Sequence, residues 1–180
     1  AWLFSGSKNE EQIDFKQEVL GTPYICEVLT RFGYEDVAYE LLLNKKIPSW
    51  LYPISMGATT IWERWNSMLP NGMVNSNSMV SFNHYAYGAV ADWMYGAAAG
   101  INSDPDRPGF EHIIFRPVTD RRLDFVKASI DTRRGTVASE WRRENGRIKY
   151  IFTVPEGCGA SAVIDGEKHE VGAGTHEFLE

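Results

Sequence analysis

The sequence has few cysteines, no long apolar run and no excess of positive charge. Its 180 residues include only Cys26 and Cys158, which form no CxxC pair. We therefore expect two free thiols, with neither a disulfide framework nor a cysteine metal site. No segment approaches the roughly 18 apolar residues that span a bilayer, so we expect no membrane partner. A net charge of −6 argues against binding to nucleic acid through its phosphates.

Motifs of several common enzyme classes are also missing. The chain has no glycine-rich phosphate loop, no G-x-S-x-G nucleophile turn and no H-E-x-x-H zinc motif. We therefore expect no cofactor and no bound metal. Residues 1–5 lack initiating Met and the basic and apolar regions of a signal peptide, which indicates a chain that begins inside a longer protein. Its cellular compartment is left open.

The abundant residues are aromatic ones, which make up 13% of the chain. Five of the six tryptophans precede residue 94. With 43% hydrophobic and 23% charged residues, the composition is typical of a soluble globular protein that buries a core. Aromatic residues gathered in one half are typical of a large core or of a cleft that faces carbohydrate. Composition alone does not choose between these.

The first helical pattern begins at residue 21. Thr22 and Pro23 suit the N-cap and first helical position, and Gly33 suits the C-terminal end, which predicts a helix between them. A second helix over 34–44 is expected to form an antiparallel hairpin with the first. The apolar positions that fall on one face of the first helix are Ile25, Val28, Leu29 and Phe32.

The next 60 or so residues alternate irregular and helical patterns. Pro48 and Pro53 argue against a regular helix over 45–57. A short helix is predicted over 59–65, and a polar loop over 69–81. The strongest helical pattern covers 83–99 and is small and apolar nearly all round, which predicts burial on most faces. About four helices could not cover it, so we infer an incomplete domain whose apolar face needs a partner.

The second half has the period of β-strands. Residues 102–109 are rich in Asp, Pro and Gly and predict a linker. Beyond it, alternating apolar and polar residues predict about seven short strands, with hairpin turns at Asn145-Gly146 and Asp165-Gly166. The expected fold is a two-part α+β chain, with a helical part over 1–104 and a small antiparallel β-sandwich over 105–180.

One carboxylate stands out in the segment GATTIWERW (57–65). Glu63 lies between Trp62 and Trp65 and beside Arg64. Aromatic neighbours desolvate a carboxylate whereas an adjacent cation stabilises its charge, a balance that suits a base ionised near neutral pH. The indole rings would also suit the apolar faces of a sugar. An ordinary Glu63–Arg64 ion pair, with both tryptophans in a core, explains the same spacing and is favoured by spacing alone.

His84 opens the apolar helical pattern. The positive end of a helix favours the neutral imidazole, which can hydrogen-bond a substrate hydroxyl. The alternative is a partly buried histidine near a helix cap, which spacing alone favours. The other histidines, His112, His169 and His176, have no metal-like spacing and receive no role.

Several segments resemble, in the same order, the C-terminal part of bacterial α-L-rhamnosidases of glycoside hydrolase family 78. In the helical half they are LGTPYICEVLTRFG (20–33), AYELLLN (38–44), PSW (48–50), GATTIWERW (57–65) and FNHYAYGAVADWMY (82–95). In the second half they are IIFRP (113–117) and VASEW (137–141). Their shared order makes the resemblance more specific than any single motif.

The resemblance implies an (α/α)6 barrel followed by a β-sandwich, and removal of terminal α-L-rhamnose with inversion. It implies that Glu63 is the general base and that His84 lines the rhamnose pocket. Further candidates for substrate binding are Trp50, Trp62, Arg64 and Trp65. Inversion also needs a carboxyl group as general acid, about 6.5–9.5 Å from the base. The family carries that acid in an Asp-rich motif upstream in the barrel, and this chain has no such motif.

Both lines of reasoning predict the last helices of a barrel plus its sandwich, with the base but without the acid. The expected partners are a rhamnose-containing glycoside and the upstream barrel half. We expect little or no activity from the isolated chain, and a dimer or higher oligomer formed through the open apolar face. Two alternatives stay open: a carbohydrate-binding module with Trp50, Trp62 and Trp65 as a stacking platform, and a structural fragment without sugar affinity.

Overall fold

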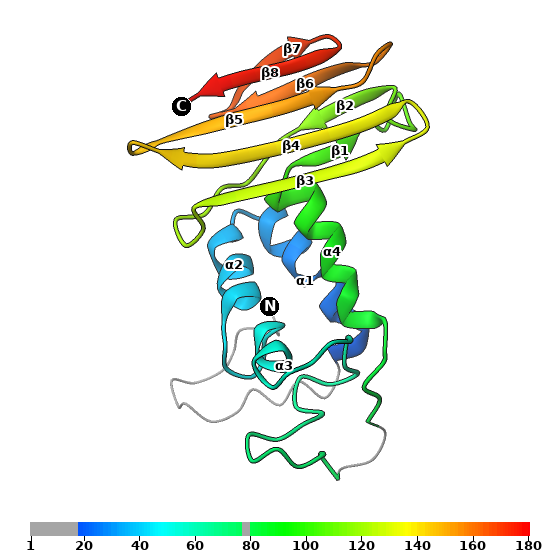
Figure 1. Ribbon diagram of the computed structural model, residues 1–180, viewed down its shortest axis with the longest axis vertical. Coiled ribbons are helices and arrows are strands. Elements are labelled where there is room, and N and C mark those ends of the chain that lie inside the picture. Colours follow the sequence, from blue (N-terminus) through cyan, green and yellow to red (C-terminus); the bar gives the residue numbers. More distant parts are fainter. Residues whose placement is uncertain (1–17, 77–79) are drawn as a thin grey trace.

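The computed structural model describes residues 18–76 and 80–180, which form a helical part and a β-sandwich placed end to end (Figure 1). The helices are α1 (Glu18–Arg31), α2 (Glu35–Leu43) and α3 (Leu51–Ser55), followed by a continuous helical run of η1 (Ala86–Ala89), α4 (Val90–Trp93) and η2 (Met94–Ala98). The strands are β1 (Ile101–Ser103), β2 (His112–Phe115), β3 (Phe125–Thr132), β4 (Gly135–Glu144), β5 (Arg147–Val154), β6 (Gly159–Ile164), β7 (Glu167–Val171) and β8 (Gly174–Leu179).

Helices α1 and α2 form the expected hairpin. Gly33, at φ +78°, ends α1, and the N–H of Tyr34 donates to the carbonyl of Leu29 at 2.8 Å. The predicted helix start at Thr22 is wrong, because α1 already begins at Glu18. Pro23 is the sixth residue of α1, so the turn that precedes it forms with one helical hydrogen bond missing.

The apolar face of α1 is divided between core and solvent. Cys26 and Leu29 are buried and pack in one cluster with residues of α2 and the helical run. Tyr24, Val28 and Phe32, which we call the apolar stripe, are 67%, 49% and 71% exposed. The positions assigned to one apolar face of α1 therefore differ in burial, with Leu29 in the core and Val28 and Phe32 exposed. Val28 and Phe32 share a side of the helix with Tyr24, because residues four apart lie on one face, and the described chain covers another side.

Two expectations for residues 45–65 are wrong. α3 forms across Pro53, because this proline is the third helical residue, where the missing N–H would have no partner within the helix. The short helix over 59–65 does not form. Its backbone bonds instead to a distant segment: Glu63 N–H donates to the Ser81 carbonyl at 2.9 Å, and His84 N–H to the Ile61 carbonyl at 2.8 Å.

The helical run confirms the helix expected over 83–99, although it begins at Ala86. It opens with a 3-10 turn and closes with a π turn, in which Ala99 N–H donates to the Met94 carbonyl at 2.9 Å. Tyr87, Val90 and Trp93 are buried. No described element covers Ala91, Asp92, Met94 and Tyr95, which agrees with the inference that about four helices could not cover this run.

The sandwich has two four-stranded sheets, in the orders β1-β2-β6-β7 and β3-β4-β5-β8. All neighbouring strands are antiparallel except β2 and β6, which run parallel. β1 pairs with β2 through Ile101 and Phe115, so the predicted linker begins only after Ser103. Both hairpin predictions are confirmed, since Asn145 and Asp165, like the glycines that follow them, have positive φ.

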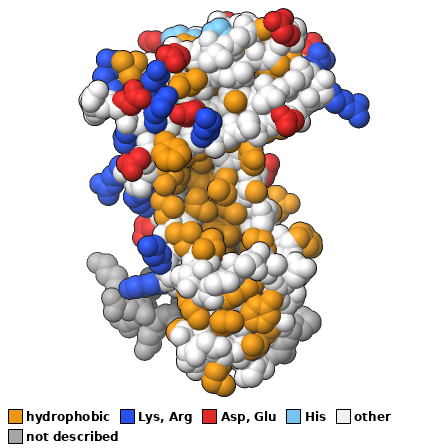
Figure 2. Space-filling model, viewed as in Figure 1, with side chains coloured by type: hydrophobic (Ala, Val, Ile, Leu, Met, Phe, Trp, Pro, Cys, Tyr) orange, Lys and Arg blue, Asp and Glu red, His pale blue; other side chains and the backbone are white. Residues whose placement is uncertain are grey.

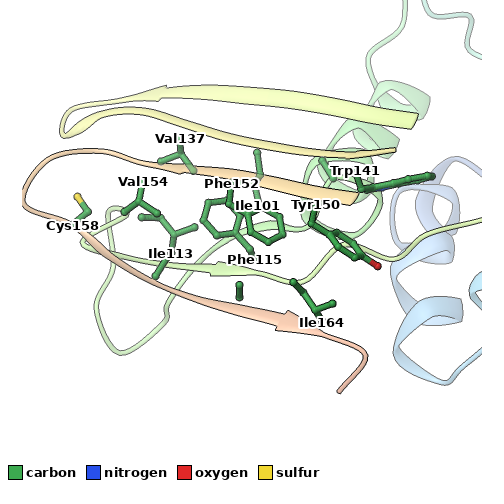
Figure 3. Packing of buried hydrophobic residues seen from close by; sticks show 13 residues of the cluster. Ile101, Ile113, Phe115, Val137, Trp141, Tyr150, Phe152, Val154, Cys158 and Ile164 are labelled. Carbon is green, nitrogen blue, oxygen red and sulfur yellow. The ribbon is translucent and has the colours of Figure 1, made fainter. Parts of the chain in front are cut away.

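The sandwich core lies between the two sheets, where side chains of both inner faces meet (Figure 3). Phe115 from one sheet stacks on Phe152 from the other, with ring centroids 4.5 Å apart. Val137 and Ile113 are fully buried beside them. Both cysteines are free, as expected, and both are buried; burial raises the pKa of the Cys26 thiol to about 12.

A polar latch ties α2 to the chain between β2 and β3. Arg122 donates twice to the Asp120 carboxylate at 2.7 Å and once to the carbonyl of Asp36 at 2.7 Å. These guanidinium hydrogen bonds hold the pKa of Asp120 below its ordinary value. The hydroxyl of Tyr39 donates to the Val118 carbonyl at 2.5 Å. The helical part and the sandwich are therefore held together by hydrogen bonds and not only by the connecting chain.

Candidate active site

Segments 60–63 and 81–84 lie side by side, which brings the part of the chain that carries Glu63 next to the part that carries His84. The backbone bonds from Glu63 to Ser81 and from His84 to Ile61 join them at two points. The hydroxyl of Thr60 adds a third bond, to the carbonyl of Phe82. The pairing replaces the helix predicted for 59–65, and it joins the segment that carries Glu63 to the segment that carries His84.

The Glu63 carboxylate is held by the backbone. Its Oε2 accepts the N–H of Ser81 at 2.8 Å, and the side chain is partly exposed. In the described part of the chain no basic side chain lies within ion-pair distance of it, so the alternative of a Glu63–Arg64 ion pair is wrong. One oxygen is thus fixed, which leaves Oε1 as the atom that could take a proton from a bound water.

His84 lies two residues before η1. Its Nδ1 accepts the N–H of Ala86 at 3.3 Å, and its ring stacks on Tyr85 with centroids 5.3 Å apart. In a neutral imidazole this bond makes Nδ1 the acceptor and places the proton on Nε2. The Nε2–H group is then a donor suited to a sugar hydroxyl.

The three candidate tryptophans are buried, at 4–8% exposure. Trp62 meets Phe82 edge to face at 5.2 Å. Trp65 stacks on Tyr87 at 3.9 Å and meets Trp50 edge to face at 4.9 Å, while Trp50 Nε1 donates to the Tyr87 carbonyl at 2.7 Å. A stacking platform for sugar requires an exposed ring face, so this packing does not favour the alternative of a carbohydrate-binding module built on these indoles.

Ser81 belongs to the site and was not found from the sequence. It contributes backbone groups, and its hydroxyl accepts the N–H of Asn83 at 3.1 Å. A serine within a polar loop carries no motif, so no sequence signal marks it. Arg64 lies one residue from Glu63 and hydrogen-bonds through its backbone to the hydroxyl of buried Ser67. The described residues contain no cluster of three His, Cys, Asp or Glu side chains that could hold a metal.

Comparison with known proteins decides the family. Residues 8–98 match the model of the bacterial alpha-L-rhamnosidase 6 hairpin glycosidase domain, and residues 100–179 match that of the bacterial alpha-L-rhamnosidase C-terminal domain. The chain belongs to the bacterial α-L-rhamnosidase family. The resemblance noted in the sequence is thereby confirmed, as is a six-hairpin barrel portion followed by a β-sandwich. None of the helices in the described ranges is long and apolar enough to cross a membrane.

Individual relatives agree with the family match. The chain is 38% identical over 179 residues to an alpha-L-rhamnosidase of Streptomyces avermitilis and 41% identical over 151 residues to one of Formosa agariphila. These matches cover 88% and 84% of this chain but only 17% and 16% of the relatives.

Two solved α-L-rhamnosidase structures have the same fold over most of this chain. The Streptomyces avermitilis enzyme complexed with L-rhamnose superposes with a TM-score of 0.82 at 36% identity, over 90% of this chain and 18% of that one. The Aspergillus terreus enzyme gives a TM-score of 0.85 at 35% identity, over 89% of this chain and 19% of that one.

Proposed function

We propose that this chain is the C-terminal part of an inverting α-L-rhamnosidase that hydrolyses terminal α-L-rhamnose from glycosides. In this proposal Glu63 is the general base and His84 binds a rhamnose hydroxyl. The observation that carries it is the pairing of segments 60–63 and 81–84. This pairing joins the segment of Glu63, whose Oε2 accepts the Ser81 N–H, to the segment of His84, whose Nδ1 accepts the Ala86 N–H and so leaves Nε2 for the substrate.

The proposed reaction has two proton transfers, one from the attacking water to the base and one from the acid to the leaving oxygen. Glu63 Oε1 takes one proton from a water molecule, whose oxygen bonds to the anomeric carbon on the face opposite the leaving group. The glycosidic bond breaks, and a general acid from the upstream barrel half protonates the leaving oxygen. Anchoring Oε2 on the Ser81 N–H holds Oε1 in one direction before the water arrives.

The remaining candidates receive supporting roles in the proposal. Trp62 and Trp65 are buried on either side of Glu63 in sequence, so we assign them to the wall that desolvates the site rather than to open stacking surfaces. Trp50 packs edge to face against Trp65 and so supports its position. Arg64 stays a candidate for substrate binding. We also propose the division into a barrel portion over 1–104 and a sandwich domain over 105–180. Strand β1 precedes this boundary in sequence, although it pairs with β2 of the sandwich.

The upstream barrel half is the proposed partner of the open face. Besides the apolar stripe, the helical part exposes Met94 and Tyr95 of the helical run, at 45% and 41%. Figure 2 shows apolar side chains gathered over the helical part, in contrast to the mixed charges of the sandwich. A patch of this kind marks a surface that a partner covers, and in a six-hairpin barrel that partner consists of the preceding helices.

We expect the isolated chain to self-associate through the apolar stripe. Replacing Phe32 by Glu should shift it toward the monomer, because a charge in a buried contact is strongly unfavourable. Light scattering over a concentration series measures the effect. Phe125→Glu is the matched control, since Phe125 is 64% exposed on the sandwich, away from the stripe. A wild-type chain that stays monomeric at all concentrations would contradict the expectation.

The function itself is tested by supplying the missing half. In a chimera, this chain replaces the corresponding C-terminal part of the Streptomyces avermitilis relative. We expect the chimera to hydrolyse an aryl α-L-rhamnoside, and the isolated chain to be at least about 10²-fold slower, because it lacks the acid. A chimera without activity, although folded by circular dichroism, would argue against the proposal. So would an isolated chain as active as the chimera.

A further inference from the structure

At the C-terminal end of the helical run, every backbone carbonyl in a row of five accepts a hydrogen bond from a residue later in the chain. The row extends from Gly96 to Gly100. The donors, in carbonyl order, are Asn102 Nδ2 at 2.8 Å, Val118 N–H at 2.9 Å, Trp141 Nε1 at 2.8 Å, Ser139 Oγ at 2.5 Å and Arg116 N–H at 2.9 Å. We call these five donors the carbonyl socket.

Such complete pairing has a clear energetic reason. The last carbonyls of a helix have no partner within it, and a buried carbonyl without a partner is costly. Here Ala98, Ala99 and Gly100 are buried, and the side chains that meet them, Ser139 and Trp141, are 1% and 0% exposed. Water therefore cannot replace these two donors, and the helix end must meet the socket in one alignment.

The socket also fixes how the helix is turned. Ser139 and Trp141 stand two apart on β4, so both project from one face of the strand toward successive carbonyls. The π turn over Met94–Ala98 widens the final turn just before them. At Gly100, an added Cβ would collide with the backbone nitrogen of Pro117, so only glycine lets the two segments approach this closely.

The other end of the same run bears the candidate site. Its 13 residues span about 20 Å at roughly 1.5 Å per residue, and His84 lies two residues before its first turn. A continuous helix transmits a rotation or shift at one end to the other. His84 in turn bonds to the segment that carries Glu63, through the Ile61 carbonyl.

We infer that Ser139 and Trp141, through the carbonyl socket, are positioning residues that hold the helical run in the register that sets His84 against the segment carrying Glu63. The two residues belong to the motif VASEW (137–141), to which the proposed chemistry gives no part. The consequence for hydrolysis rests on the proposed function, whereas the effect on the helix and on His84 does not.

The test uses the full chain with Trp141→Phe and Ser139→Ala, each of which removes one socket donor. Tyr150→Phe and Ser161→Ala are the matched controls. Each control loses a side-chain hydrogen bond of a buried residue in the same sandwich, to Glu180 and to His112 with Glu170 respectively. Unfolding midpoints in urea show how far each variant weakens the sandwich as a whole.

The deciding readouts lie at the far end of the helix. We expect both socket variants to speed amide exchange at Ala86 by about fivefold, as one lost hydrogen bond implies, and to shift the NMR signals of the His84 ring. The control variants should leave the Ala86 exchange rate and the His84 signals unchanged, even where they lower the urea unfolding midpoint as much as the socket variants do. If the socket variants only lower the midpoint, and Ala86 and His84 match the controls, the inference is overturned.

A second arm separates this inference from the proposed function. In the chimera, the socket variants should lower kcat by about tenfold or more while KM changes little, since misplacement of a pocket group costs rate. An inactive wild-type chimera would defeat the proposed function, and amide exchange at Ala86 and the His84 signals would still decide whether the socket positions the helix. An active chimera whose kcat is unaffected by both socket variants would count against the positioning role.

Discussion

Glu63→Gln is expected to lower kcat of the active chimera by about 10²–10⁴-fold, the usual contribution of a general base. The amide has nearly the shape of the carboxylate, and its oxygen can still accept the Ser81 N–H that holds Oε2 at 2.8 Å. It cannot, however, take a proton from water. The loss should therefore appear in kcat, with KM for an aryl α-L-rhamnoside little changed.

Two further measurements sharpen that result. Azide needs no deprotonation, so adding it should restore turnover to Glu63→Gln and form the rhamnosyl azide of inverted configuration. Glu156→Gln is the matched control, since Glu156 is exposed in the turn between β5 and β6 and should retain wild-type kcat. A loss below about tenfold for Glu63→Gln would remove Glu63 from the role of base.

Trp141→Ala is expected to lower the free energy of unfolding by about 3–5 kcal/mol, the usual cost of truncating a fully buried large aromatic side chain. Trp141 is 0% exposed at the inner end of the sandwich core, where Figure 3 shows it close to the helical part. The substitution also leaves the Ala98 carbonyl without the indole donor. The measured loss should therefore fall at the upper end of the range.

Urea unfolding followed by circular dichroism measures this loss. Domains of ordinary size have total stabilities of about 5–15 kcal/mol, so such a loss removes a large share. Phe125→Ala serves as the control, because an exposed aromatic side chain should change stability by no more than about 0.5 kcal/mol. A cost below about 2 kcal/mol for Trp141→Ala would show that the core closes over the space, which would also weaken the case for the socket.

The sandwich was predictable because its signals are local. Alternation along a strand and an Asn-Gly or Asp-Gly pair at a turn each depend on residues adjacent in sequence, and both appear in the structure at Asn145 and Asp165. The helix over 59–65 failed for the opposite reason. Its residues fit a helical pattern, but their backbone groups bond to 81–84, and no local pattern reveals a partner about 20 residues away.

The candidate site divides in the same way. Glu63 and His84 could be proposed from the sequence because their motifs are short and contiguous. Ser81 was missed because it contributes mainly backbone groups, which are the same in every residue. The exposure of Val28 and Phe32 could not be predicted either, since an apolar pattern shows which residues share a face but not whether the described chain covers that face.

The carbonyl socket has a consequence for the order of events during synthesis. All five donors follow the helix in the chain, and the last, Trp141, comes 43 residues after the Ala98 that it bonds. At roughly 5–20 residues per second, translation delivers Trp141 about 2–9 s after Ala98. A nascent chain halted before β4 has an unfinished helix end. We therefore expect the end of this helix, although made first, to gain its full set of hydrogen bonds only after β4 has emerged.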